Sequence, residues 1–183
     1  LFGIKLRYRR IIFLFDRSYS IVQNGWKKVI IDTCKEILEH CEVDEFAIVA
    51  FSSEVAFFPP RRKIMAAGSP DNKAQAVKWL DSGVRFGGAT HLDEALKIAY
   101  EEYGDLDAIF ILTDGLPTAR GYTTQDLQAK IVKYVGDKVK QKIQTKIIAI
   151  SIGYPTGNTE DYGEIYKHLH RLCELTDGQY LGR

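Results

Sequence analysis

The sequence predicts an α/β fold: a doubly wound, mostly parallel six-stranded sheet with one short antiparallel edge strand and helices on both faces. Apolar runs of strand length alternate with segments whose apolar residues recur every three or four positions. That order is typical of parallel strands joined by helices. The segment 55–58 follows closely on the apolar run 46–51 and stops at Pro59-Pro60, which predicts a short strand turning back at a sheet edge.

The first half of the chain has clear local signatures. Residues 11–15 are all large and apolar, which suits a strand buried on both faces of a sheet. Apolar residues at alternating spacings of three and four predict an amphipathic helix over 26–41. Ser69 followed by Pro70 is typical of a helix start, and this helix is expected to end near Gly83.

The second half continues the alternation. The expected elements are a helix opened by Thr90, a strand at 108–112, a helix at 124–142, a strand at 146–152, a helix at 163–174 and a strand at 179–181. Because no linker or internal repeat interrupts this order, we expect one domain over residues 1–183, with 1–8 as an N-terminal lead-in segment.

Composition narrows the class of protein. The chain has 183 residues, of which 45% are hydrophobic and 27% charged, and its formal net charge is +1. This balance argues against a dedicated nucleic-acid binder. The sequence has no apolar run of transmembrane length, so we expect no direct membrane insertion. The chain starts at Leu1 rather than Met, which suggests a part of a larger polypeptide.

The three cysteines are too few for a disulfide scaffold. Cys34, Cys41 and Cys173 fall at apolar positions of the expected first and last helices. We therefore predict that they are buried free thiols that act as small hydrophobic residues.

Polar side chains gather at three places where strands end or helices begin. The segments are Asp16-Arg17-Ser18-Tyr19-Ser20, Gly87-Gly88-Ala89-Thr90 and Thr113-Asp114-Gly115. Ligands of such sheets bind at the carboxyl ends of strands, and hard oxygen donors suit Mg²⁺, Mn²⁺ or Ca²⁺. The predicted metal ligands are Asp16, Ser18, Ser20, Thr90 and Asp114.

Each segment taken alone also has a purely structural interpretation. Asp16 is compatible with the start of a capping turn, and Asp114 with an ordinary turn before Gly115. Thr90, with Asp93 three residues on, resembles a helix capping box. The metal-site hypothesis rests on all three segments occurring together in this order.

The three segments resemble the motifs of the von Willebrand factor A domains, whose metal site is called the metal-ion-dependent adhesion site. The Asp-x-Ser-x-Ser motif of that family is matched at residues 16–20, its Thr in a Gly-rich loop at Thr90, and its Asp-Gly at Asp114-Gly115. The resemblance covers nearly the whole chain and is closest to bacterial members. It implies the Rossmann-like fold of this family.

The resemblance also implies a function without catalysis. It indicates a metal-dependent protein-interaction or adhesion module, with Mg²⁺ as the expected ion and Mn²⁺ or Ca²⁺ as alternatives. The expected partner is a protein that completes the coordination with a Glu or Asp side chain. We further expect Arg17 and Tyr19, which stand between the ligand positions, to select the partner, and metal binding to survive their replacement.

Two alternatives remain open from the sequence. One is a metal-dependent phosphatase-like hydrolase with Asp16 as phosphoryl acceptor, although Ser18 stands where haloacid-dehalogenase phosphatases have a second Asp. The other is a structural subunit whose site is filled by a carboxylate of its own chain. The free cysteines are compatible with a cytosol, whereas the family resemblance leans toward an extracytoplasmic or cell-surface location in a bacterium.

Overall fold

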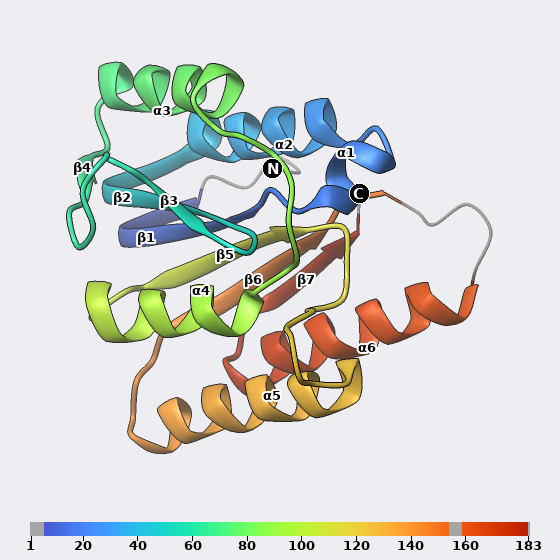
Figure 1. Ribbon diagram of the computed structural model, residues 1–183. Helices are drawn as coiled ribbons and strands as arrows, with labels where there is room; N and C mark the ends of the chain where they lie inside the picture. Colours follow the sequence, from blue (N-terminus) through green and yellow to red (C-terminus); the bar gives the residue numbers. More distant parts are fainter. Residues whose placement is uncertain (1–5, 154–158, 183) are drawn as a thin grey trace.

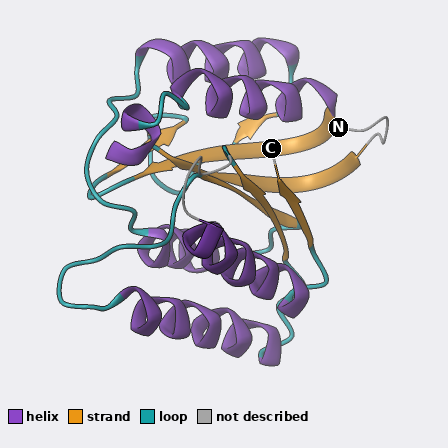
Figure 2. Ribbon diagram, turned by 90° about the vertical axis from the view of Figure 1, so that its right-hand side faces the viewer, coloured by secondary structure: helices purple, strands orange, loops and turns teal. Residues whose placement is uncertain are grey.

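The computed structural model, which describes residues 6–153 and 159–182, consists of a central sheet between two layers of helices (Figures 1 and 2). The strands are β1 (Leu6–Asp16), β2 (Cys41–Phe51), β3 (Val55–Phe58), β4 (Ala66–Ala67), β5 (Ala108–Thr113), β6 (Lys146–Ser151) and β7 (Gln179–Gly182). The helices are α1 (Tyr19–Gln23), α2 (Lys27–His40), α3 (Pro70–Ser82), α4 (Leu92–Ile98), the π-helix η1 (Ala99–Tyr103), α5 (Thr124–Lys140) and α6 (Thr159–Leu175).

The sheet has the order β3-β2-β1-β5-β6-β7, with β4 paired to β2 beside this path. β1 is parallel to both β2 and β5, and β6 and β7 continue the parallel part. The chain therefore builds the sheet outward in both directions from β1, and the strand order reverses between β1 and β5. The predicted α/β class and its mostly parallel, doubly wound sheet are confirmed.

The predicted number of strands was wrong by one. β3 is the expected antiparallel edge strand, but β4 also pairs antiparallel with β2, through Glu45 and Phe46, so the sheet has seven strands. β4 has only two residues, Ala66 and Ala67. A segment so short cannot display the two-residue periodicity by which strands are predicted.

Two hydrophobic layers hold the sheet between the helices. Ile11, Phe13 and Phe15 of β1 pack with residues of α2 and α3, whereas Ile12 and Leu14 pack with residues of α4, α5 and α6. All five side chains are fully buried. Because successive strand residues point to opposite faces, one uninterrupted apolar run supplies both layers.

The largest boundary difference lies between α2 and β2. Helix α2 ends at His40, and Cys41 begins β2 opposite Leu6 of β1, rather than lying on the helix. β1 begins at Leu6, so residues 6–8 of the expected lead-in segment 1–8 belong to the sheet, and residues 1–5 lie outside the described residues. Polar residues alternate irregularly at the start of β2, so the apolar pattern did not reveal that this stretch pairs with β1.

Smaller differences concern the helix ends. The short helix α1 was not predicted, and α4 begins at Leu92 with His91 rather than Thr90 as its N-cap. The last helix begins at Thr159, before the predicted 163. All three cysteines are buried and free, as predicted. Among the described residues, no helix is both long and apolar enough to cross a membrane.

Candidate metal centre

The candidate site lies at the carboxyl edge of the sheet, where β1 and β5 end side by side. Phe15 pairs with Leu112, so Asp16 and Thr113 leave the two strands at the same level. Helix α1 follows β1 directly at this edge (Figure 1). This is the position between oppositely wound halves at which sheets of this class bind ligands.

Asp16 is the innermost carboxylate of the site and is fully buried. Its Oδ1 accepts the backbone N–H of Ser18 at 2.8 Å, and its Oδ2 accepts the hydroxyl of Thr113 at 2.6 Å. Burial raises the pKa of Asp16 to about 7, with a smaller contribution from Asp114, while the hydrogen bonds from Thr113 and Ser18 oppose the rise. The site thus stabilises the ionised carboxylate only in part.

Ser18, Ser20 and Asp114 connect the first and third segments. The hydroxyls of Ser18 and Ser20 lie 3.0 Å apart, and Ser20 Oγ donates to Asp114 Oδ1 at 2.7 Å. Asn24 Nδ2 donates to Asp114 Oδ2 at 3.3 Å. Burial raises the pKa of Asp114, against the hydrogen bonds from Ser20 and Asn24. We call the side chains of Asp16, Ser18, Ser20 and Asp114 the oxygen cluster.

Thr90 is buried, but among the described residues no hydrogen bond joins its hydroxyl to the oxygen cluster. Its backbone N–H donates to Thr118 Oγ1 at 2.9 Å, and its carbonyl accepts the N–H of Thr118 at 2.9 Å and that of Leu92 at 3.0 Å. The helix cap is His91, so the Thr90 side chain is not used for capping. Hydrogen bonds therefore connect four of the five predicted ligands to one another, and Thr90 is the fifth.

The loop that carries Thr90, residues 85–90, is attached to the first segment by its backbone. The N–H of Gly87 donates to the carbonyl of Arg17 at 2.7 Å, and the N–H of Tyr19 donates to the carbonyl of Gly88 at 3.0 Å. Gly88 has φ of +91°, a conformation that glycine adopts without strain. This loop, called the Thr90 loop below, thus lies directly against the Asp16–Ser20 segment.

The two residues that were expected to face a partner, Tyr19 and Arg17, differ in their exposure to solvent. Tyr19 is 62% exposed, in agreement with such a position. Arg17 is only 8% exposed, and its guanidinium donates to backbone carbonyls inside the protein. The expectation for Arg17 was wrong, because its side chain folds back beneath the loops instead of projecting beside the site.

Sequence reasoning missed two supporting residues, Thr113 and Asn24. Thr113 is a polar residue at the end of an otherwise apolar strand, and this is a signal that could have assigned it to Asp16. Asn24 reaches Asp114 only because α1 turns the chain back at Asn24. Since α1 was not predicted, the sequence offered no comparable signal for Asn24.

The donor set is compatible with a hard divalent ion. It contains two carboxylates and three hydroxyls, and oxygen donors of this kind suit Mg²⁺, Mn²⁺ or Ca²⁺ rather than a soft metal. Within residues 6–153 and 159–182, no Lys, Arg or His forms an ion pair with Asp16 or Asp114. Nor does this part of the chain contain a group of three or more His, Cys, Asp and Glu side chains placed to hold a metal.

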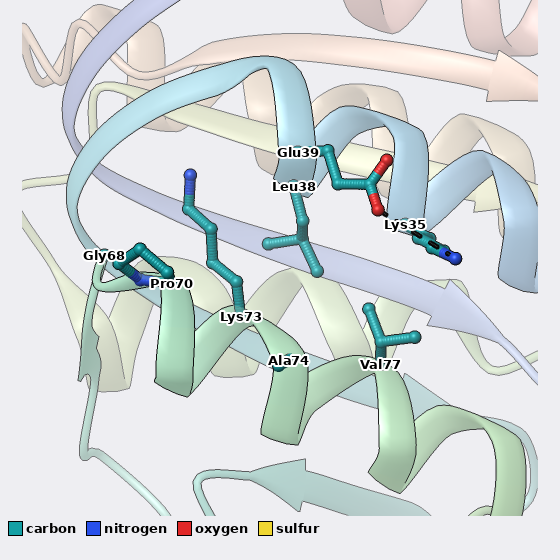
Figure 3. Close-up of a pocket in the computed structure, with 8 residues that line it drawn as sticks. All are labelled: Lys35, Leu38, Glu39, Gly68, Pro70, Lys73, Ala74 and Val77. Carbon is teal, nitrogen blue, oxygen red and sulfur yellow. Dashed lines mark ion pairs between the residues drawn. The ribbon is translucent and has the colours of Figure 1, made fainter.

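A separate hollow of about 460 Å³ lies between α2 and α3 (Figure 3). Leu38, Ala74 and Val77 form its apolar wall, and its carboxylate, Glu39, pairs with Lys35 at 3.9 Å. It adjoins the end of α2 and the start of α3, at the opposite edge of the sheet from the oxygen cluster. It therefore forms no part of the candidate metal centre.

The fold and the oxygen cluster define this chain as a three-layer α/β domain with a candidate ligand site at the reversal of its strand order. Its sequence matches the family model of the von Willebrand factor type A domain over residues 11–173, and the chain belongs to this family. A comparison with curated protein sequences finds no match.

Two solved structures illustrate the likeness of fold. A von Willebrand factor type A protein from Catenulispora acidiphila is 17% identical with a TM-score of 0.65, and the match covers 96% of this chain and 38% of that one. The human COPII-coat protein Sec24c is 10% identical with a TM-score of 0.59, covering 100% of this chain and 30% of that one. This chain thus spans well under half of either protein, and at these identities the likeness concerns the fold.

Proposed function

We propose that this domain is a metal-dependent protein-interaction module. It would bind Mg²⁺, with Mn²⁺ or Ca²⁺ as alternatives, through Asp16, Ser18, Ser20, Thr90 and Asp114, and would then bind a Glu or Asp side chain of a partner protein. The observation that carries the proposal is the oxygen cluster, which connects two strand ends at the reversal of the strand order. Domains of this family generally serve as protein-interaction modules.

The electrostatics of the cluster support a cation. Burial raises the pKa of both Asp16 and Asp114, because ionised carboxylates lose hydration there. No cationic side chain of the described residues pairs with either of them. Since a buried charge is normally paired or bound to a metal, a divalent ion would supply the missing positive charge.

The composition of the cluster also supports recognition of a partner. Hydroxyl ligands are neutral, so two carboxylates are the only negative charges among the five candidate ligands. An ion held by such a set supplies a Lewis-acidic position for a further carboxylate. Tyr19, which is 62% exposed beside Ser18 and Ser20, would contact the partner next to that carboxylate.

Calorimetric titration with Mg²⁺ and Mn²⁺ tests the metal site. We expect saturable binding by the wild-type domain, and at least a tenfold loss of affinity, about 1.4 kcal/mol, in Asp114→Asn. The matched control is Asp71→Asn, because Asp71 is an exposed residue in the first turn of α3, at the opposite edge of the sheet from the oxygen cluster. Absence of saturable binding by the folded wild-type domain would contradict the proposal.

The second step is tested with acetate as a minimal carboxylate. Water-proton relaxation of the Mn²⁺-loaded domain should fall as acetate is added, because a carboxylate replaces water on the ion. Chloride at the same ionic strength is the control for screening. If acetate leaves the relaxation unchanged although Mn²⁺ is bound, the metal does not serve to recognise carboxylates.

A further inference from the structure

Arg17 connects three separate segments beneath the candidate metal centre. Its guanidinium donates three hydrogen bonds to backbone carbonyls: Nε to Ala50 at 3.3 Å, Nη1 to Arg85 at 2.6 Å and Nη2 to Glu54 at 2.9 Å. Ala50 belongs to β2, Glu54 to the β2–β3 turn and Arg85 to the start of the Thr90 loop. One side chain therefore fixes the Thr90 loop to the sheet.

The backbone of Arg17 strengthens the same connection. Its N–H donates to the carbonyl of Phe51 at 3.0 Å, and its carbonyl accepts the N–H of Gly87 at 2.7 Å. Farther along the Thr90 loop, the N–H of Ala89 donates to Ser53 Oγ at 2.8 Å. The loop is thus attached at successive positions before it reaches Thr90.

The burial of Arg17 shows that these contacts are specific. The residue is 8% exposed, and within the described part of the chain its guanidinium donates to backbone carbonyls, not to carboxylates. Burying an uncompensated cation is costly unless its donors are well satisfied. The planar guanidinium can reach three carbonyls in different directions, which the single ammonium of a lysine cannot reproduce.

We propose that Arg17 is a positioning residue that holds the Thr90 loop against the Asp16–Ser20 segment, so that the Thr90 hydroxyl is arranged for the ion before the ion binds. The consequence for metal affinity rests on the proposed function, whereas the consequence for the loop does not. Arg17 therefore acts on the site from beneath it, through Arg85, Gly87 and the rest of the loop, rather than by contact with a partner.

Amide hydrogen exchange without added metal tests the positioning itself. In Arg17→Gln we expect the amides of residues 85–90 to exchange at least tenfold faster than in the wild type, while the amides of β5 keep their rates. Arg10→Gln is the matched control, because Arg10 contacts Glu45 and Gly104 near the start of β1. Unchanged exchange of residues 85–90 in Arg17→Gln would overturn the proposal.

A second variant covers the case in which Arg17→Gln does not fold. Arg17→Lys keeps the charge but loses the planar arrangement of donors. We therefore expect amide exchange over residues 85–90 to be faster than in the wild type, by a smaller factor than in Arg17→Gln. Wild-type exchange in Arg17→Lys would show that a buried cation is sufficient and that the three-way contact is not needed, which also overturns the proposal.

A double-mutant cycle tests whether Arg17 acts on the metal through Thr90. We expect Arg17→Gln and Thr90→Ala each to weaken Mn²⁺ binding about tenfold, and the double variant to bind no more weakly than Thr90→Ala alone. Additive losses, or wild-type affinity in Arg17→Gln, would contradict the proposal. If the wild-type domain binds no Mn²⁺, the proposed function fails, and the metal-free exchange measurement still decides the role of Arg17.

Discussion

Thr113 donates a hydrogen bond of 2.6 Å from its hydroxyl to Oδ2 of Asp16, and so joins the last residue of β5 to the last residue of β1. Both residues are fully buried. The contact holds the Asp16 carboxylate in place through Thr113, a residue that is not itself a proposed metal ligand. It therefore allows the support of the site to be tested separately from its ligands.

Thr113→Val should lower the free energy of unfolding by about 1–3 kcal/mol, because the buried carboxylate of Asp16 loses one of its two hydrogen bonds and the N–H of Gly115 loses its bond to the Thr113 hydroxyl. Urea unfolding measures this loss. The matched control is Thr33→Val in α2, where a buried hydroxyl bonds the carbonyl of Val29 at 2.7 Å. That carbonyl keeps its helical partner, so a loss below about 1 kcal/mol is expected. Equal losses in both variants would show that the bond to Asp16 has no special weight.

Gly88→Ala should distort the Thr90 loop. Gly88 has φ of +91°, and an added Cβ would lie 2.8 Å from Ser53 Oγ, so both the backbone and the contact are unfavourable for alanine. We expect a loss of stability of about 1–3 kcal/mol, measured by urea unfolding. Gly136→Ala in α5 is the control, because its Cβ meets nothing within 4 Å, and a gain of about 0.5–1 kcal/mol is expected there. Wild-type stability of Gly88→Ala would mean that the loop adapts.

The buried position of Asp16 predicts that the domain does not hydrolyse phosphate esters. A phosphoryl-accepting carboxylate must contact the phosphorus atom directly, whereas a carboxylate can hold Mg²⁺ through a water that the ion retains. Asp16 is 0% exposed and both its oxygens accept hydrogen bonds, from Ser18 and Thr113. We expect no hydrolysis of p-nitrophenyl phosphate above the buffer rate in the presence of Mg²⁺. Mg²⁺-dependent turnover that disappears in Asp16→Asn would instead support the hydrolase alternative.

The fold could be predicted because its main elements carry strong and redundant patterns. Ile11–Phe15 is apolar at every position because both of its faces are buried, and the long helices show clear periodicity. β4 and α1 are too short for such patterns, and their formation depends on neighbours. β4, for example, exists only as a partner of Glu45 and Phe46 in β2.

The sequence predicted that polar residues of the candidate site meet, but it did not predict the residues that support them. Asp16, Ser20 and Asp114 carry chemistry that the sequence displays, and their order along the strands predicted that they meet. Arg17 bonds to backbone carbonyls, which every residue possesses, so no sequence pattern could indicate its partners. The sequence therefore suggested a residue facing outward where the structure has one facing inward.

His168 of α6 makes the stability of the domain sensitive to acid. It is buried, its Nε2 has no hydrogen-bond partner among the described residues, and burial lowers its pKa to about 4. In the unfolded chain the imidazole of His168 takes up a proton near pH 6.5, whereas in the native domain it does so only near pH 4. The contribution of His168 to stability is therefore fully present above pH 6.5 and falls as the pH drops from about 6.5 to 4. The loss from this residue should be on the order of 3 kcal/mol.

Urea unfolding at several pH values, compared between the wild type and His168→Gln, measures this contribution. Other groups also titrate in this range, so the difference between the two proteins isolates His168. His170→Gln is the control on the same helix, since the His170 side chain is 41% exposed beside Glu174. We expect the difference in unfolding free energy between wild type and His168→Gln to change steeply with pH, and more steeply than the corresponding difference for His170→Gln. A pH-independent difference for His168→Gln would mean that the native domain accommodates the protonated imidazole.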